Sequence, residues 1–425
     1  METSKLADRL RGIVQQSGRR APAVDVGPTA PVPDAARVVE SVLGGEWRDE
    51  GGHRRFVVER RIDPDERHGS VRVGDLAECC ARHAAQASML TAGAPARLPF
   101  MFFDLETTGL SGGAGTYAFL VGFGSFDASG AFVTRQFVMT APSDERPLLE
   151  AVSRDVAGAG ALVSFNGRSF DAPVLETRYL FHRLEWPGSR VPHLDALYPA
   201  RRFWSGDEGT SCSLVTLERQ ILGVGRAGDV PGFEIPARYF QFVRSGDARP
   251  LAAVLEHNRL DLLSLAGLTA RLLQLLADGP RSACDAREAL ALGRIYARSG
   301  LDGRARESFT CVLVMDASAR MRSESLRSLA CEARRSRRFD EAAAYWREVL
   351  DTPGCAPHVS REANEALAIH HEHRARDLAA AKTFALRSLE TCSRPVWNEA
   401  VRHRLARLQR KMERREGPGL LAYQD

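Results

Sequence analysis

The run Phe100–Glu106, FMFFDLE, constrains the fold of this chain more than any other segment. It opens with four apolar residues, which indicates a strand buried on both faces in the centre of a sheet. Asp104 and Glu106 stand two residues apart, so their side chains face the same side of a strand. The run therefore predicts a central strand whose C-terminal end carries two acids on one face.

The segments that follow alternate between strand and helix signals. Residues 116–126 and 131–139 have strand composition, and Asp127–Gly130 between them predicts a hairpin turn. A helix is predicted to begin at 143–145. A buried strand is predicted at 161–167 and an amphipathic helix at 170–184. Three strands in a meander, then helix, strand and helix, predict an α/β fold with a mixed sheet flanked by helices.

The chain has 425 residues, which favours two or three domains over one. Composition and pattern divide it into five parts. We expect a disordered or weakly ordered leader at 1–44, a small β lead-in and helix at 45–96, the α/β domain at 97–278, a helical domain at 285–412 and a tail at 413–425.

Residues 285–412 show helical patterning throughout. Three helix pairs align at a spacing of 37–38 residues, with Ala305, Ala342 and Ala380 at the small position of each second helix. This rhythm resembles tetratricopeptide-type repeats, whose usual period is about 34 residues. An irregular helical bundle is the alternative.

Nothing in the chain predicts a membrane or exported protein. The apolar stretch 251–276 is broken by charges such as Glu256 and Asp261, so we interpret it as a packed helix. The first 20 residues lack a signal-peptide pattern. The eight cysteines form no CxxC pair, which disfavours a zinc site and suits reduced thiols. We therefore expect a cytoplasmic location and no membrane partner.

The paired acids have two interpretations. Anions as close as Asp104 and Glu106 repel each other unless a cation lies between them, and Mg²⁺ and Mn²⁺ prefer oxygen ligands. The alternative is a solvated pair at a strand end. The glycine-rich loop Ser111–Gly115 would let a phosphate approach, although a plain linker has the same composition.

Two later motifs carry further acids. Asp171 follows the Asn166–Gly167 turn near the start of a helix, where the helix dipole alone would favour an acid. His257 and Asp261 are four residues apart on an otherwise apolar helix, so they share one face and need partners. A satisfied core pair is the alternative for these two residues.

Taken in order, DLETTG, NGRSFD and HNRLD resemble the three motifs of the DEDD exonuclease superfamily. The phrases GLSGGAGTYAFLVGFG, PHLDAL and LEHNRLDLLSLAGL resemble the YprB-type ribonuclease H-like domain over residues 97–278. The resemblance implies a ribonuclease H-like fold and a 3′–5′ exonuclease that hydrolyses DNA or RNA. It also implies two divalent cations, Mg²⁺ or Mn²⁺, held by Asp104, Glu106, Asp171 and Asp261.

The resemblance gives His257 a catalytic role with one departure. Three residues separate His257 from Asp261, the spacing of the superfamily's tyrosine subclass, whereas its histidine subclass has four. His257 would orient or deprotonate the attacking water, or would instead bond the scissile phosphate or a ligand carboxylate. We interpret Thr107, Asn166 and Asp195 as contacts to nucleic acid. A turn residue is the alternative for Asn166; for Asp195 the alternatives are an acid behind the metal ligands, a helix cap or a surface acid.

The expected partner is nucleic acid, with a single-stranded 3′ end favoured. Mild basicity, a net charge of +4, permits this partner without requiring it. Arg201–Trp204 combines cations with aromatics, which suits a single strand, but surface arginines beside a packed Trp give the same pattern. The helical repeats would recruit a protein partner.

Two other functions remain open. The first is a non-catalytic nucleic-acid-binding protein with a nuclease-like fold. The second is phosphoryl transfer through an aspartyl nucleophile, which the sequence disfavours because the second acid is Glu106 and lysine occurs only at 5, 382 and 411.

Overall fold

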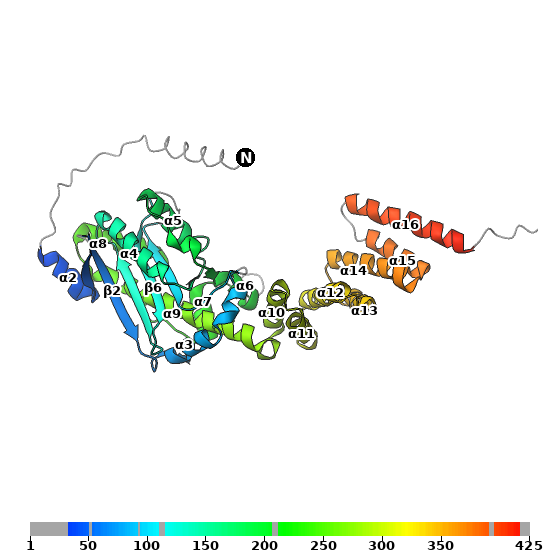
Figure 1. Ribbon diagram of the computed structural model, residues 1–425, viewed down its shortest axis with the longest axis horizontal. Coiled ribbons are helices and arrows are strands. Elements are labelled where there is room, and N and C mark those ends of the chain that lie inside the picture. Colours follow the sequence, from blue (N-terminus) through cyan, green and yellow to red (C-terminus); the bar gives the residue numbers. More distant parts are fainter. Residues whose placement is uncertain are drawn as a thin grey trace, which may run out of the picture.

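The computed structural model describes residues 33–50, 53–91, 94–109, 115–205, 211–390 and 395–416. Figure 1 shows a sheet covered by helices and an arm of paired helices that extends from one side of it. The expectations for residues 1–32, for most of the glycine-rich loop and for the last nine residues lie outside the described residues.

The main sheet has seven strands in the order β1-β2-β7-β6-β5-β8-β9. Strand β5 lies inside it, antiparallel to β6 and parallel to β8. The mixed sheet predicted from the sequence is thereby confirmed. The strands are β1 (Glu46–Glu50), β2 (His53–Ile62), β5 (Phe100–Thr107), β6 (Ala118–Phe126), β7 (Phe132–Val138), β8 (Ala161–Ser164) and β9 (His193–Asp195), and β3 (Arg67–His68) pairs separately with β4 (Val71–Arg72).

The local patterns explain the centre of the sheet. Phe102 and Phe103 point to opposite faces of β5 and both are buried, as a continuous apolar run requires. The hairpin between β6 and β7 turns where it was predicted. There the Asp127 carboxylate accepts the backbone N–H groups of Ser129 and Ala131 at 2.8 and 3.0 Å.

The N-terminal segments join this sheet. Strand β2 pairs with β7 over seven residues, so the hairpin β1–β2 extends the main sheet. Residues 33–43, expected to belong to the weakly ordered leader, form helix α2 (Pro33–Leu43), and that expectation is wrong for them. Val39 and Leu43 are one turn apart and both are buried in the core, which holds the helix against the fold.

Helices cover the sheet, and α9 packs against β5, β6 and β7. Among the described helices α9 alone is long and apolar enough to cross a membrane, but 72% of its most apolar window is buried inside the fold. This confirms the packed helix expected at 251–276. The helices around the sheet are α3 (Val73–Arg82), α4 (Glu145–Ala157), α5 (Asp171–Phe181), α6 (Leu197–Trp204), α7 (Leu214–Leu217), α8 (Ile235–Ser245) and α9 (Arg249–Asp278).

The C-terminal arm is helical, as expected. Ala305 and Ala342 are buried at matching positions, but Ala381 rather than Ala380 is the buried residue of the third pair. The π-turn His371–Ala375 accounts for the shift, because it lengthens the connection. The arm comprises α10 (Ala286–Arg298), α11 (Asp302–Val314), α12 (Ala319–Arg335), α13 (Phe339–Leu350), α14 (Pro357–His370), α15 (Leu378–Glu390) and α16 (Pro395–Glu416).

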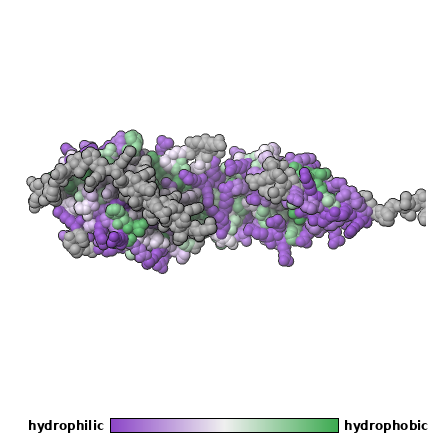
Figure 2. All heavy atoms as spheres, turned by 90° about the horizontal axis from the view of Figure 1, so that it is seen from above, coloured by the Kyte–Doolittle hydropathy of each residue, from purple (hydrophilic) through white to green (hydrophobic). Residues whose placement is uncertain are grey.

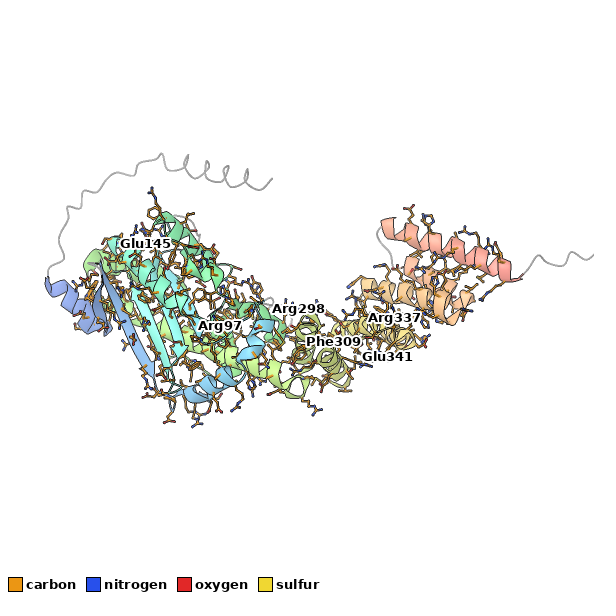
Figure 3. The ribbon with its side chains drawn as sticks, viewed as in Figure 1. Arg97, Glu145, Arg298, Phe309, Arg337 and Glu341 are labelled. Atoms are coloured by element: carbon orange, nitrogen blue, oxygen red, sulfur yellow. The ribbon has the colours of Figure 1, made fainter. Side chains whose placement is uncertain are left out.

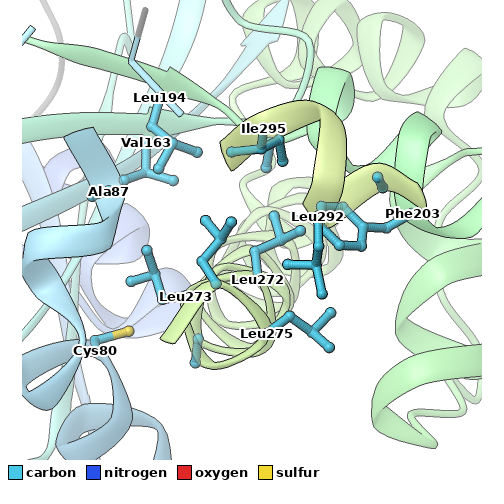
Figure 4. Packing of buried hydrophobic residues seen from close by; sticks show 14 of the residues in the cluster. Cys80, Ala87, Val163, Leu194, Phe203, Leu272, Leu273, Leu275, Leu292 and Ile295 are labelled. Atoms are coloured by element: carbon cyan, nitrogen blue, oxygen red, sulfur yellow. The ribbon is translucent and has the colours of Figure 1, made fainter. Parts of the chain in front are cut away.

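The arm and the sheet share one core. Figure 4 shows Leu272 and Leu273 of α9 between the sheet residue Val163 and Leu292 of α10. Two hydrogen bonds cross the same junction, from Trp204 Nε1 to Glu288 Oε1 at 2.9 Å and from Tyr296 Oη to the Leu276 carbonyl at 2.9 Å. The first helices of the arm are therefore fixed relative to the sheet.

Candidate functional site

The four sequence-predicted acids come from three elements. Asp104 and Glu106 lie near the C-terminal end of β5, Asp171 is the first residue of α5, and Asp261 lies in α9. Burial raises the pKa of Asp104 well above its ordinary value, and the charges of Asp261, Glu106 and Asp171 raise it further. The fold therefore brings these carboxylates together, and we call the four of them the carboxylate site.

The electrostatics of Glu106 and Asp171 follow the same logic. Burial raises the pKa of Glu106 well above its ordinary range, with further contributions from Asp261 and Asp171. Burial and then the neighbouring Asp195 raise the pKa of Asp171 to about 7. Each additional negative charge at the carboxylate site is unfavourable, because too little positive charge lies nearby to balance the acids.

A buried polar relay holds Asp104 in place. Asp104, Gly122 and Gln136 are register partners on the adjacent strands β5, β6 and β7. The side chain of Asn258 reaches over Gly122 from α9, and its Nδ2 donates to Asp104 Oδ2 at 2.8 Å. Gln136 Nε2 donates to Asn258 Oδ1 at 2.8 Å and to the carbonyl of Leu255 at 2.7 Å.

Glycine is required at position 122 for this relay. A Cβ on Gly122 would lie 2.1 Å from Asn258 Oδ1, closer than any side chain tolerates. Asn258, Gln136 and Gly122 were not predicted from the sequence as site residues. The available signal was a glycine inside an apolar strand, which marks a close approach by another group.

Arg226 lies within the site as a cation, and it was not predicted from the sequence as a site residue. Its guanidinium makes two bonds of 2.7 Å to the Glu218 carboxylate, one of 3.0 Å to Asp229 and a short one to Asp261 Oδ1. Burial raises the pKa of Asp261, whereas Arg226 and then His257 oppose that rise. Arg226 therefore compensates Asp261 within the fold.

The ring of His257 is oriented by an acid. Nδ1 lies 2.8 Å from Asp229 Oδ1, and Nε2 lies 3.6 Å from Asp261 Oδ2. The first distance is a hydrogen bond, and the second is too long for one. Asp229 thus directs Nε2 of His257 toward the carboxylate site, which supports the positioning that the sequence suggested for this histidine.

The three residues interpreted as nucleic-acid contacts have structural roles. Asp195 is buried, and its carboxylate accepts the backbone N–H groups of Asn166, Arg168 and Leu197 at 2.8–3.1 Å. The buried hydroxyl of Thr107 donates to the Gly109 carbonyl at 2.9 Å. These bonds give both side chains a structural role, and their contacts to nucleic acid stay a prediction; Asp195 also lines a cavity with Arg168 and Arg202.

Asn166 fits the turn alternative. Its backbone has φ of 70°, a left-handed conformation that asparagine tolerates better than most residues. The side chain is exposed, so it is accessible to a ligand beside the carboxylate site.

The donor set suits a hard divalent cation. Among the described residues, no three His, Cys, Asp or Glu side chains are arranged to hold a metal ion directly. Asn258 engages Asp104 and Arg226 engages Asp261, so a cation would compete with these partners. Four carboxylates whose charges are mutually unfavourable nevertheless match the oxygen ligands that Mg²⁺ and Mn²⁺ prefer.

Comparison with known proteins agrees with the fold. Residues 101–273 match the family model of the RNase_H superfamily. Together with the mixed sheet and its flanking helices, this match is consistent with a ribonuclease H-like fold over these residues. Over 323 residues the chain is 29% identical to "Uncharacterized protein YprB" of Bacillus subtilis (strain 168), covering 73% of this chain and 74% of that protein.

Proposed function

We propose that this protein is a metal-dependent nuclease that removes nucleotides from the 3′ end of DNA or RNA. The observation that carries the proposal is the gathering of four carboxylates from β5, α5 and α9 at one end of a ribonuclease H-like sheet. Their pKa values are raised by burial and by one another's charge. Such a set is stabilised by bound divalent cations.

The side chains of the site have separate roles in the proposed reaction. The carboxylate site would hold Mg²⁺ or Mn²⁺, which when bound lowers the pKa of a water and stabilises charge on the leaving oxygen. Asn258 fixes the carboxylate of Asp104. His257, oriented by Asp229, would accept a proton or a hydrogen bond at Nε2 from the attacking water.

The test is hydrolysis of end-labelled single- and double-stranded DNA and RNA by the full chain with Mg²⁺ or Mn²⁺. We expect a ladder of products that shorten from the 3′ end. Chelation of the divalent cation should abolish the ladder, and the double variant Asp104→Ala/Glu106→Ala should not produce it. Glu176→Gln, an exposed acid on α5, is the matched control and should cut like wild type. A ladder that persists in the double variant would refute the proposal.

One observation favours a binding protein without cleavage. Arg226 already satisfies one oxygen of Asp261, as a resident cation does at sites that hold no metal. Under this alternative the protein would bind nucleic-acid ends equally well with and without divalent cations, and no product would appear. Calorimetric titration with Mn²⁺ separates the two, because the nuclease requires binding that Asp104→Ala/Glu106→Ala abolishes.

A further inference from the structure

Two adjoining cavities lie at the junction between the sheet region and the arm. The first, about 680 Å³, is lined by Arg168, Arg202 and Arg298. Arg168 belongs to the turn that precedes α5, and Asp195, whose charge raises the pKa of Asp171, also lines this cavity. The second, about 540 Å³, shares Arg202 and Arg298 and reaches Arg334 on α12. The two cavities form a continuous concave surface across the junction.

We use the name arginine path for Arg168, Arg202, Arg298 and Arg334. All four residues are exposed, and none has an ion-pair partner within the described ranges. Burial and then the charges of Arg298 and Arg294 lower the pKa of Arg202. Arg202, Arg294 and Arg298 are therefore close enough to repel one another. Acids also line the cavities, Asp195 in the first and Asp302 and Glu332 in the second, but within the described residues none of them forms an ion pair with the four arginines of the path.

Other arginines of the second cavity are compensated inside the arm. The pairs are Arg294 with Glu324 at 2.7 Å, Arg327 with Glu362 at 2.6 Å, and Arg306 with Glu341. Acids of the arm thus neutralise some of its arginines and leave the arginine path uncompensated. An uncompensated row of cations in a concave surface attracts an extended anion.

The first cavity also presents an aromatic ring. Tyr198 is 44% exposed, and its hydroxyl lies 3.0 Å from Ser169 Oγ, beside Arg168. An exposed ring next to arginines offers a surface on which a base can stack. In Arg201–Trp204 the aromatics are not available, because Phe203 is buried and Trp204 is bonded to Glu288.

The path is fixed relative to the site. Figure 3 shows Arg298 at the junction between the sheet and the arm, with Phe309 beside it. In the view of Figure 2, hydrophilic residues cover much of the arm. Because α10 belongs to the same core as the sheet, the path keeps one distance and direction from the carboxylate site.

We propose that the arginine path binds the phosphate backbone of a single-stranded nucleic acid whose 3′ end lies at the carboxylate site. The inference rests on the proposed nuclease function and assigns the arm to substrate binding. The charge of the path matches phosphate, and Asp195, which lines the first cavity, neighbours Asp171 of the carboxylate site, so a strand that extends from that site enters the path. An acidic protein segment is the other ligand that such a surface attracts.

The test measures binding apart from cleavage, in full chains that carry Asp104→Ala/Glu106→Ala. The probes are fluorescent single strands of about 20 and about 5 nucleotides, since grooves for single strands cover about 4–16 nucleotides. Adding Arg202→Gln/Arg298→Gln should weaken binding of the long strand about tenfold. The slope of log affinity against log salt concentration should become shallower by about 1.4, or about 0.7 per lost phosphate contact. Arg334→Gln should act in the same direction with about half the change in slope, and binding of the short strand should be unchanged.

The matched control, Arg249→Gln/Arg281→Gln, removes the same charge from exposed positions outside both cavities. It should bind like the parent chain, with thermal midpoints confirming that all variants fold. Equal losses in the two double variants, or no loss in the path variants, would overturn the proposal. So would a polyglutamate peptide that displaces the long strand at lower concentration than unlabelled strand does.

Cleavage is scored separately, in chains with an intact carboxylate site. The variant Arg202→Gln/Arg298→Gln should degrade the short strand at the wild-type rate and the long strand with a raised KM and an unchanged kcat. If the chain cuts neither strand but still binds the long strand through the path, the nuclease function alone is refuted. Cleavage of both strands with wild-type KM would refute the path alone.

Discussion

The carboxylate site and the arginine path use charge in opposite ways. The acids are wholly or partly buried, and Asn258 holds Asp104 while Arg226 compensates Asp261. The cations of the path are exposed and have no counter-anion in the described structure. Buried charge depends on its partners for stability, whereas exposed charge contributes little to stability and remains available to a ligand. The first arrangement suits a compact cation and the second an extended anion.

The largest effect should come from breaking a buried ion pair that anchors α5. Arg178 bonds Glu145 through two contacts of 2.5 Å, and both residues are almost fully buried. Glu145→Gln leaves that guanidinium poorly compensated, so we expect a loss of about 3–5 kcal/mol in the free energy of unfolding. Urea denaturation measures it. The control Glu150→Gln removes the surface pair with Arg146 and should cost less than about 1 kcal/mol; equal losses would contradict the comparison.

The relay beneath Asp104 should be the next most sensitive. In Gly122→Ala the new methyl group would displace Asn258, so we expect a loss of about 1–3 kcal/mol in stability. Affinity for Mn²⁺ should fall about 10–100-fold, because the partner of a ligand carboxylate moves. Calorimetric titration and urea denaturation report the two effects. Gly225→Ala meets no atom within 4 Å and serves as the control; a Gly122→Ala chain that matches it would refute the close approach.

Acid should destabilise the sheet region through His68. Its ring lies 2.8 Å from Ser264 Oγ, and burial followed by the charges of Arg226 and Arg259 lowers its pKa from 6.5 to about 4. The unfolded chain therefore binds a proton that the folded chain rejects, and stability falls as pH drops from about 6.5 toward 4.

Between pH 7 and pH 5 this residue should contribute a loss of roughly 2 kcal/mol. Urea denaturation at both pH values measures that loss for wild type and for His68→Gln, in which the amide keeps a hydrogen bond to Ser264. The variant should lose about 2 kcal/mol less than wild type over the interval. An identical pH dependence in both chains would show that His68 is not the buried neutral group described here.

The smallest effect should come from the compensated arginines of the arm. Arg327→Gln removes an exposed pair with Glu362 and should change the free energy of unfolding by less than about 1 kcal/mol. It should also weaken binding of a long single strand less than Arg298→Gln does, because Glu362 already neutralises Arg327. A larger loss of binding for Arg327→Gln would mean that pairing within the arm does not decide which arginines meet the ligand.

Local patterns in the sequence were sufficient for the framework of the site. The apolar run into Asp104 and Glu106 gave a correct central strand, and the Asp127–Gly130 turn gave a correct hairpin. The helix expected after Asn166 begins at Asp171, and the start of this helix therefore sets the position of the Asp171 carboxylate. These features depend on periodicity and turn chemistry within a few residues, which a sequence shows directly.

The partners of those acids depend on contacts that no local pattern reveals. Gln136 and Asn258 are 122 positions apart, and Arg226 meets Asp261 across 35. The third helix pair of the arm was misaligned by one residue because a π-turn leaves no periodic signal of its own. Asp195 was ambiguous for the same reason, since only the folded turn shows which backbone groups its carboxylate accepts.

Helix α9 has a consequence for how the protein can be divided. Its first half carries His257 and Asp261, and its second half supplies Leu272 and Leu276 to the core shared with α10. A fragment that stops at Asp278 would expose that apolar side to water and would be prone to aggregate. The smallest fragment suited to expression therefore has to keep the first helices of the arm, and the nuclease-like half cannot be studied as a free-standing module.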